Sequence, residues 1–349
     1  MPTVQAERLM EIARVLLQAA GASEEEAATV ARYNIGANLV GHDSHGIILI
    51  PTYIDRIKNN HIVPGAPWVI TQETGNTTVV DGNWGFGYVV TDRAMRHTIE
   101  KAKKGGVAAT TVFRQSHVGR LASYPLMAAQ EGMIAMITAD SGRSAKAVAP
   151  FGGAKARLGT NPICFAIPSN LEGPLFFDMA TSAAAAGKIN VATARGEQVP
   201  AGWLIDAEGR PSTDPRVLKQ GGALLPVGGT EGYKGYGLAT IVEILSGLLT
   251  GLGFGVEPSG RHNDGCFIAV FNVSAFRDLT TFKQEVTEFA QYLKATPPAQ
   301  GFTEVLYPGE IEFRREQDRR KNGIPVEDAT WNKLASMAKE YGVADKLRF

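Results

Sequence analysis

The spacing of apolar residues alternates along the chain between a helical and a strand-like pattern. Of all features of the sequence, this alternation most restricts the possible folds. Apolar residues recur at helical spacing over residues 9–17. Ser23 followed by Glu26 forms a capping box, which predicts a second helix running to about Leu39. Strand-like runs at 77–80 and 107–113 flank a helical pattern over 91–104. The beginning of the chain therefore predicts an α/β protein.

The alternation continues to the C-terminus. A helix is expected around 120–131, and three later runs have the length and composition of strands, at 133–138, 163–167 and 175–177. The last run leads into Asp178 and a predicted helix of small residues. Further predicted elements are a long apolar helix over 234–249, a strand over 266–273, an amphipathic helix over 280–294 and charged C-terminal helices after Pro297-Pro298.

Composition excludes several classes of protein. The 349 residues are 44% hydrophobic and 20% charged, which is typical of a soluble globular protein with one large domain or two. Lys+Arg and Asp+Glu both number 35 and no basic run occurs, so neither nucleic acid nor a membrane is an expected partner. Cys164 and Cys266 lie in apolar runs without metal-ligand spacing, which predicts reduced core residues, no metal site and a cytoplasmic location. No targeting or membrane-spanning segment is visible.

A reactive cluster, His-Asp-Ser-His-Gly, occupies residues 42–46 directly after a predicted helix. His45 can exchange a proton near neutral pH, and Ser44 or Asp43 could orient it. Turns held by a rigid scaffold often carry catalytic groups. The alternative interpretation is that Asp43 and Ser44 cap a helix and both histidines are solvated.

Common cofactor motifs are missing from the sequence. Gly251-Leu-Gly253-Phe-Gly255 comes closest to the dinucleotide-binding pattern, but Val256 takes the place of the last glycine and the segment follows a helix. Walker, zinc-protease and nucleophile-elbow motifs do not occur either. Residue chemistry alone therefore predicts a soluble α/β enzyme with a histidine site and no Rossmann domain.

Eight short motifs, in order, span nearly the whole chain. They are Gly41-His-Asp-Ser-His-Gly-Ile47, Pro51-x-Tyr53, Ser116-His117-x-Gly119, Gly159-Thr-Asn-Pro162, Asp178-Met-Ala-Thr-Ser182, Tyr233-Lys-Gly235, Pro308-Gly-Glu310 and Asn322-Gly-Ile-Pro325. Together they strongly resemble the type-2 malate/L-lactate dehydrogenase family, and within it the bacterial hydroxycarboxylate dehydrogenase group. Each motif alone would be weak, but their order and spacing make coincidence improbable.

The resemblance implies a fold of its own type, in which N- and C-terminal helices pack together around a central cofactor domain. The expected division is a helical domain of residues 1–75 with 310–349 and an α/β cofactor domain of residues 76–309. The resemblance also implies NAD or NADP as cofactor, with NAD preferred, and a homodimer whose formation completes the active site.

The activity implied by the resemblance is the interconversion of 2-hydroxycarboxylates and 2-oxocarboxylates by hydride transfer. His45 matches the family's proton donor, and Ser44 and Asp178 match the residues around it. His117 matches a position that lines the pocket, where it would bind the substrate or serve as an alternative acid. The alternatives are a helix N-cap for Asp178 and a buried structural role for His117. His61, His97 and His262 receive no role.

The resemblance also implies cofactor contacts at three segments and at one single residue of this chain. They are Pro174, Leu175, Phe176, Phe177, Asp178, Met179 and Ala180, then Tyr233 and Lys234, then Gly309, Glu310 and Ile311, and finally Ser141. Lys234 starts a predicted helix, where it would meet a phosphate or a ribose hydroxyl; a solvated lysine is the alternative. Gly159 and Thr160 are expected to form a wall of the same cleft, and Thr160 to contact the substrate.

One departure from the family concerns the substrate carboxylate. Many members carry an arginine where this chain has Leu49, so another cation is needed. Arg120, predicted one helical turn beyond His117, could grip the carboxylate through two parallel hydrogen bonds, although a surface arginine is the alternative. Leu49 favours apolar or aromatic substrates over malate or sulfolactate. Three kinds of alternative stay open. They are a malate, lactate or ureidoglycolate dehydrogenase, a cyclic imino-acid reductase, and a cofactor-binding protein without turnover.

Overall fold

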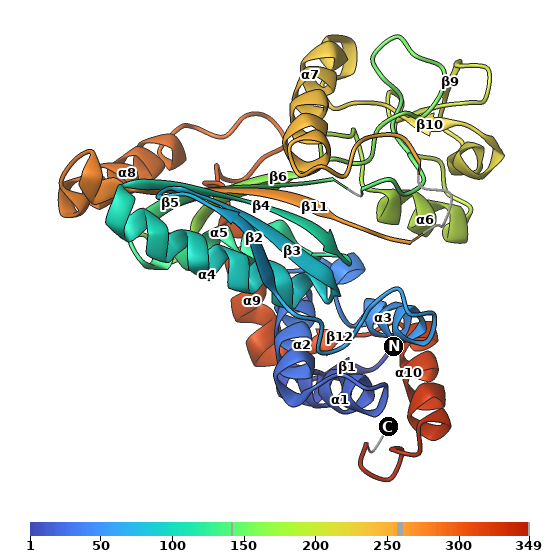
Figure 1. The fold of residues 1–349 in the computed structure, drawn as a ribbon. Helices are drawn as coiled ribbons and strands as arrows, with labels where there is room; N and C mark the ends of the chain where they lie inside the picture. Colours follow the sequence, from blue (N-terminus) through green and yellow to red (C-terminus); the bar gives the residue numbers. More distant parts are fainter. Residues whose placement is uncertain (141, 257–260, 348–349) are drawn as a thin grey trace.

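A seven-stranded mixed sheet forms the centre of the protein (Figure 1). The computed structural model describes residues 1–140, 142–256 and 261–347, so the expected cofactor contact at Ser141 lies outside the described residues. The strand order is β2-β3-β4-β11-β5-β6-β7, with only β3 and β4 parallel. The strands are β2 (Val69–Glu73), β3 (Thr77–Gly85), β4 (Val107–Gln115), β5 (Met133–Asp140), β6 (Ile163–Ile167), β7 (Leu175–Met179) and β11 (Gly265–Asn272).

Local patterns predict these strands well, but not their order. The strand Ile163–Ile167 has the predicted bounds, and five others extend the predicted runs or shift them by one residue, whereas β2 was not predicted. In β11, Cys266 pairs with Val112 of β4 on one side and with Ala139 of β5 on the other. A strand from late in the chain is thus inserted between two earlier ones. Cys164 and Cys266 are buried free thiols, as predicted for core residues.

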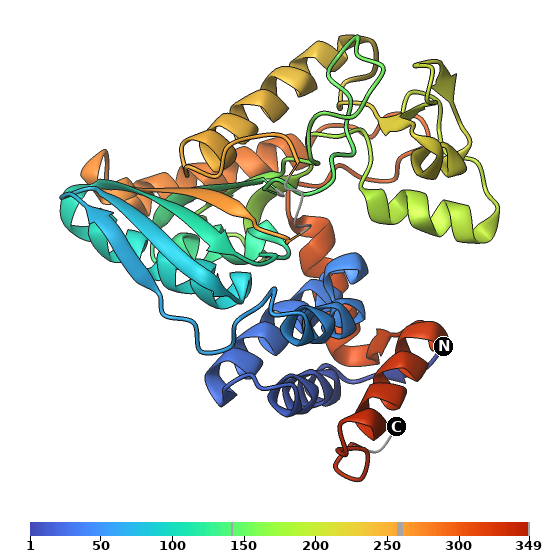
Figure 2. The same cartoon turned by 45° about the vertical axis from the view of Figure 1, so that its right-hand side comes forward.

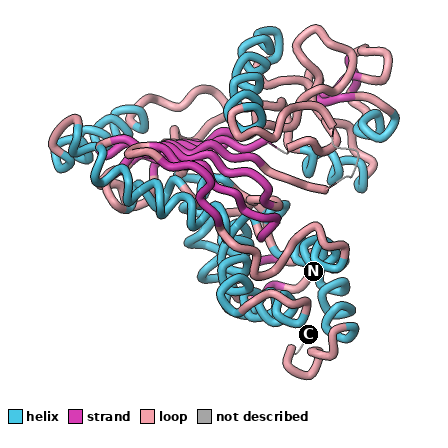
Figure 3. The backbone as a smooth tube through the Cα atoms, in the orientation of Figure 1, coloured by secondary structure: helices cyan, strands magenta, loops and turns pink. Residues whose placement is uncertain are grey.

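Helices cover both faces of the sheet (Figures 1 and 3). One face carries α4 (Gly87–Gly105) and α5 (Pro125–Gln130), and the opposite face carries α7 (Gly232–Glu243), which continues as a π-helical turn over Ile244–Leu248. At Gly265 a Cβ would overlap the Ser246 carbonyl oxygen, so the π-helical turn packs directly on β11. The amphipathic helix α8 (Leu279–Lys294) lies at the far end of the sheet (Figure 1).

A small lobe lies beyond the edge of the sheet (Figure 2). It contains α6 (Ala186–Arg195), a 3₁₀ helix over Pro215–Gln220 and a three-stranded sheet of β8 (Leu204–Ile205), β9 (Pro211–Ser212) and β10 (Ala223–Leu224). Its own hydrophobic cluster includes Val148, Ile189 and Leu204. Short strands and a separate small core make this lobe an addition to the main sheet.

The two ends of the chain pack together in the lower part of the molecule in Figure 1. The N-terminal elements are β1 (Thr3–Val4), α1 (Ala6–Ala19), α2 (Glu24–Leu39) and α3 (Ile50–Lys58), and the C-terminal elements are α9 (Glu310–Asn322), β12 (Ile324–Pro325) and α10 (Asp328–Glu340). β1 pairs with β12, and the capping box predicted at Ser23 and Glu26 is present. The expected boundary at residue 75 would separate β2 from the sheet with which it pairs.

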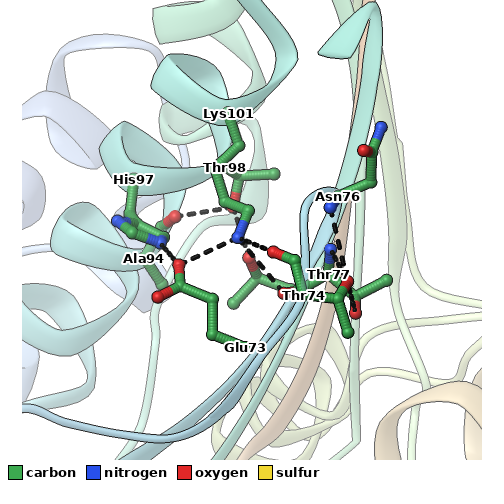
Figure 4. A network of polar contacts seen from close by, with 9 residues as sticks. Glu73, Thr74, Asn76, Thr77, Ala94, His97, Thr98 and Lys101 are labelled. Carbon is green, nitrogen blue, oxygen red and sulfur yellow. Dashed lines mark hydrogen bonds and ion pairs between the residues drawn. The ribbon is translucent and has the colours of Figure 1, made fainter. Parts of the chain in front are cut away.

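A polar network fastens α4 to the turn between β2 and β3 (Figure 4). The Lys101 ammonium donates to Glu73 at 2.8 Å and to the Thr74 carbonyl at 2.6 Å. His97 Nε2 lies 2.9 Å from the same Glu73 carboxylate, and these two partners lower the pKa of Glu73. His97 therefore has a structural position on the outer side of α4.

Two predicted helices differ from the structure. The helix expected over 120–131 is a 3₁₀ turn, Leu121–Ser123, followed by the short α5, because Pro125 has no N–H and fits only the first turn of a helix. The helix expected after Asp178 begins only at Ala186. Asp178 lies inside β7, so its alternative role as a helix N-cap is wrong. Within the described ranges, no helix is both long and apolar enough to cross a membrane.

Candidate active site

The reactive cluster at residues 42–46 lies on a tight turn between α2 and α3. Asn38, near the end of α2, shapes this turn: its Nδ2 donates to Asp43 Oδ1 at 2.7 Å, and its Oδ1 accepts from the Ile47 N–H at 2.8 Å. A Cβ at position 46 would overlap the Asn38 amide, so the turn requires Gly46. One side chain thus holds both ends of the turn that carries His45.

Within this turn, Ser44 and not Asp43 is the neighbour of His45. Ser44 Oγ lies 3.1 Å from His45 Nδ1. The Asp43 carboxylate faces away, because Arg319 of α9 binds it with contacts of 2.6 and 3.0 Å. The sequence left both orienting groups open, and the geometry favours Ser44.

His117, in the loop after β4, stacks on His45. The two ring centroids are 5.7 Å apart and the planes differ by 21°. Tyr53 OH lies 2.8 Å from His117 Nδ1 and 3.0 Å from Tyr88 OH, and both tyrosines are buried. A Cβ at Gly87 would overlap the Ser116 and His117 carbonyls, so the start of α4 packs directly against the loop. The structure therefore brings together the two histidines that the sequence predicted as site residues.

His262 and Asp264 also join this site, although the sequence assigned no role to either. His262 Nε2 lies 2.7 Å from Asp264 Oδ1, and Asp264 Oδ2 accepts from the Val118 N–H at 3.0 Å. The His262 ring centroid is 5.6 Å from that of His117. The only signal in the sequence was an aspartate next to the predicted strand at 266–273, with a histidine two residues before it.

Burial controls the protonation of the two stacked histidines. It lowers the pKa of His45 to about 4, with smaller contributions from His42 and Arg120. It also lowers the pKa of His117 to about 3, although the Asp264 carboxylate opposes this shift. Burial works against ionisation of Asp264 too, but His262 and His117 outweigh it and lower the pKa of that carboxyl. Both imidazoles are therefore neutral at pH 7, beside an ionised Asp264.

Arg120 is a buried cation beside this group. Its Nε and Nη2 have no hydrogen-bond partner among the described residues, and its guanidinium carbon lies 4.9 Å from the Phe176 ring centroid. Burial lowers the pKa of Arg120, while Asp178 opposes the shift. A buried guanidinium with unsatisfied N–H groups is suited to an incoming carboxylate. The alternative prediction, that Arg120 is a surface arginine, is therefore wrong.

The prediction that Arg120 reaches the site from one helical turn beyond His117 is also wrong. His117 and Arg120 do not share a helical turn, because Gly119 has φ +72° and Arg120 is extended at the start of a 3₁₀ turn. Asp178 Oδ2 accepts from the Ala122 N–H at 2.8 Å. Burial raises the pKa of Asp178 and the Arg120 charge opposes this. In the described part of the chain, Asp178 thus faces Ala122 and Arg120, with no hydrogen bond to His45.

Two of the segments expected to contact the cofactor, residues 174–180 and 309–311, meet at β7. The Phe176 N–H donates to the Pro308 carbonyl at 3.2 Å, and a Cβ at Gly309 would overlap Phe176 and the Pro174 carbonyl. The Thr160 carbonyl accepts from the N–H of Thr181, which follows β7. The strand also contains three further expected contacts, Leu175, Phe177 and Met179, and Ala180 directly follows it. These contacts place the expected segments around one strand.

The remaining expected contacts differ in how accessible they are. Tyr233 and Lys234 are exposed on the first turn of α7, which begins two residues before the predicted start at Lys234. Ile311 is exposed as well. The Glu310 side chain, in contrast, is buried and accepts from the Tyr307 N–H, Lys294 and Arg314. Only the backbone of Glu310 is left to face a ligand.

Comparisons with known proteins agree with this architecture. Residues 4–335 match the family described as malate/L-lactate dehydrogenase. The chain is 36% identical to an L-sulfolactate dehydrogenase of Methanothermobacter thermautotrophicus, covering 97% of each chain. It is 34% identical to hydroxycarboxylate dehydrogenase B of Escherichia coli K12, covering 98% of this chain and 95% of the other.

A solved structure supports the same assignment. The crystal structure of malate dehydrogenase from Entamoeba histolytica superposes with a TM-score of 0.93 at 35% identity, over 98% of both chains. The family resemblance and the α/β fold predicted from the sequence are thereby confirmed. The chain therefore belongs to the malate/L-lactate dehydrogenase family, and it is an oxidoreductase.

Proposed function

We propose that this protein is a nicotinamide-dependent dehydrogenase that interconverts 2-hydroxycarboxylates and 2-oxocarboxylates. The observation that carries the proposal is the buried Arg120 guanidinium, with unsatisfied Nε and Nη2, beside the stacked pair of His45 and His117. The reaction needs a cation for the substrate carboxylate and a proton carrier near the C2 oxygen. Arg120 and His45 supply these two groups.

His45 exchanges the proton in this proposal. In the oxidation direction its neutral ring accepts the hydroxyl proton at Nε2, while Nδ1–H donates to Ser44 Oγ and fixes that tautomer. In the reduction direction the protonated ring returns the proton to the C2 oxygen. The negative charge of a substrate carboxylate at Arg120 raises the pKa of His45 and so favours the protonated form. His117, held by Tyr53, lines the same pocket and is the alternative acid.

The residues around α7 and β7 fit a dinucleotide cofactor. A bound nicotinamide would supply the hydride acceptor for C2 in oxidation and the hydride donor in reduction. Lys234 is exposed on the first turn of α7, a turn without acidic residues, where backbone N–H groups also attract a phosphate. Phe177 offers an exposed ring on β7. Glu231 Oε2 lies 3.1 Å from Lys234 Nζ and would repel the 2′-phosphate that distinguishes NADP from NAD, which favours NAD.

Leu49 defines the preferred substrates. It is half-buried and packs against the main hydrophobic core. With the carboxylate held at Arg120, an apolar side chain at position 49 suits an apolar or aromatic substituent on C3 of the substrate. Malate and sulfolactate, which carry a second charged group, are expected to be poorer substrates.

An absorbance assay tests the proposed function. Purified protein is mixed with NADH or NADPH and a panel of 2-oxo acids, both aromatic and dicarboxylic, together with cyclic imines. We expect oxidation of NADH with 2-oxo acids, fastest with the aromatic ones. Turnover restricted to cyclic imines would make the protein a C=N reductase, and cofactor binding without turnover would make it a binding protein.

We also propose that the protein is a cytoplasmic homodimer. The outer face of α7 and of the π-helical turn exposes Ile241, Ile244, Leu248 and Leu249, an apolar row that a second copy would cover. Two free buried thiols suit a reducing compartment. We retain the division into a helical and a cofactor domain, with β2 assigned to the latter because it pairs with β3.

A further inference from the structure

A cleft of about 650 Å³, lined mainly by polar residues, lies at one end of the central sheet. It is bounded by the turn after α3, the ends of β3 and β4, residues 251–252 after the π-helical turn, and Arg261 and Asn263 before β11. The lining residues that matter here are Asn60, Trp84, Arg114, Arg143 and Arg261. None of them belongs to the group around His45 and Arg120 described above.

Three arginines bring positive charge into this cleft. The Arg261 guanidinium carbon lies 3.7 Å from the Trp84 ring centroid, which holds it as a cation–π pair against one wall. Arg114 is fixed by Asp81, whose Oδ1 accepts from its Nε at 2.9 Å. Burial lowers the pKa of Arg261, and the Arg114 charge lowers it further. The two guanidinium groups thus repel each other, and an anion between the walls would relieve that repulsion.

The backbone of the cleft is unusual as well. Asn60, Trp84 and Arg114 have φ values of 53°, 66° and 52°. Trp and Arg seldom adopt this left-handed conformation, because the Cβ crowds the backbone. Three of the five non-glycine residues with positive φ in the described ranges line this one cleft. Strained residues cluster where a structure has to aim particular side chains.

The same segments continue into the active site. Arg261 directly precedes His262, which contacts His117, and Asn263 of the lining directly precedes Asp264. Ser144, next to Arg143, has its Oγ 3.4 Å from His262 Nδ1. A ligand held by Arg143 and Arg261 would therefore contact both segments that position His262 beside His117.

We propose that this cleft is a binding site for a small oxyanion, a phosphate or a carboxylate, held by Arg143 and Arg261 against Trp84. Guanidinium groups bind both anions through paired hydrogen bonds, and Asn60 and Asn263 add amide donors. Two kinds of ligand could supply such an anion. One is the cofactor, through one of its phosphates, and the other is a free anionic metabolite.

Calorimetric titration of the purified protein with inorganic phosphate tests the site without requiring catalysis. We expect saturable binding by the wild type, and affinity roughly ten- to a hundredfold weaker in Arg261→Gln and in Arg143→Gln, because each loses charge-assisted hydrogen bonds. Arg157→Gln, at an exposed arginine outside the cleft, is the matched control and should bind like the wild type. Arg261→Lys retains the charge and should keep part of the affinity, and circular dichroism reports whether each variant is folded.

A competition experiment between NAD⁺ and inorganic phosphate distinguishes the two kinds of ligand. If the anion is a cofactor phosphate, NAD⁺ displaces inorganic phosphate from the wild type; if it is a free metabolite, both bind at once. Either result supports the site. No saturable phosphate binding by the wild type, or unchanged binding in both folded Gln variants, would overturn the proposal and leave the proposed dehydrogenase activity unaffected.

Discussion

Burial holds the pKa of His45 at about 4, below the usual range of an imidazole near 6.5. The folded protein therefore presents a neutral ring next to Ser44 throughout the neutral range. In the proposed mechanism this neutral form accepts a proton from the substrate hydroxyl group, which suits the ligand-free protein to the oxidation direction. For the reduction direction, we propose that the substrate carboxylate at Arg120 raises the pKa of His45.

A pH profile follows from this shift. For oxidation, kcat/KM reports the base in the free enzyme, so it should stay constant from about pH 8 to about pH 5 and fall only toward pH 4, where the ring becomes protonated. Initial rates at low 2-hydroxy acid concentration measure it. A midpoint near 6.5 would show that the base is an imidazole that burial does not affect.

Replacing His45 tests its role directly. His45→Asn retains a hydrogen-bonding group but cannot titrate, so the chemical step should slow by roughly two to four orders of magnitude. Cofactor binding, measured by fluorescence titration, should be nearly unchanged. His117→Asn is the comparison, since its ring stacks on His45 but is bound to Tyr53. Normal turnover in His45→Asn with loss in His117→Asn would transfer the role to His117.

Arg120 carries a second prediction at the residue scale. Arg120→Met removes the carboxylate partner and should raise KM for every 2-oxo acid, at a cost on the order of 1.5–3 kcal/mol. Adding Leu49→Arg to that variant should recover part of the loss, mainly for small or dicarboxylic substrates, because the new side chain occupies space that an aromatic group needs. Steady-state kinetics of both variants provide the measurement. Unchanged KM in Arg120→Met would place the carboxylate elsewhere.

At the scale of elements, the turn between α2 and α3 positions His45. Asn38 spans that turn, and Gly46 leaves room for its amide. Gly46→Ala should push the amide out and shift His45; since a misplacement of about 1 Å can cost about a hundredfold, kcat should fall by at least about tenfold. The matched control is Gly36→Ala within α2, where a Cβ meets nothing within 4 Å.

The control has its own expected result. Gly36→Ala should raise the free energy of unfolding by about 1 kcal/mol, because alanine favours a helix over glycine, and should leave kcat unchanged. Thermal denaturation and steady-state assays of both variants separate the two effects. Equal kcat in Gly46→Ala and the wild type would mean that the turn tolerates a side chain and does not fix His45.

At the scale of the whole molecule, the apolar row on α7 and the π-helical turn predicts self-association. Light scattering should give twice the monomer mass for the wild type. Two charges within the row, in Ile241→Lys with Leu248→Lys, should produce monomers, and activity should fall with them if the dimer completes the site. Gln220→Lys adds a charge at an exposed position of the small lobe and is the control. A fully active wild-type monomer would refute the dimer.

Local patterns were sufficient for most individual elements. The capping box at Ser23 and the strand Ile163–Ile167 follow from neighbouring residues, because period and end signals act over a few positions. The helix predicted from Lys234 is present but begins two residues earlier, at Gly232. The reactive turn at 42–46 and the ordered family motifs likewise belong to the sequence alone. Local signals were misleading around Arg120, where Gly119 and Pro125 replace the expected helix by a turn.

Only the tertiary structure decided which distant groups meet. β11 enters between β4 and β5, and this brings Asp264 to the N–H of Val118, 146 residues away in the chain, and His262 to His117. Strand order across a sheet depends on the packing of the whole core rather than on local propensity. The sequence by itself thus determined most of the elements, the family and the His45 turn. Tertiary packing alone set the burial that keeps His45 and His117 neutral and leaves Arg120 unsatisfied, because desolvation exists only once the surrounding elements assemble.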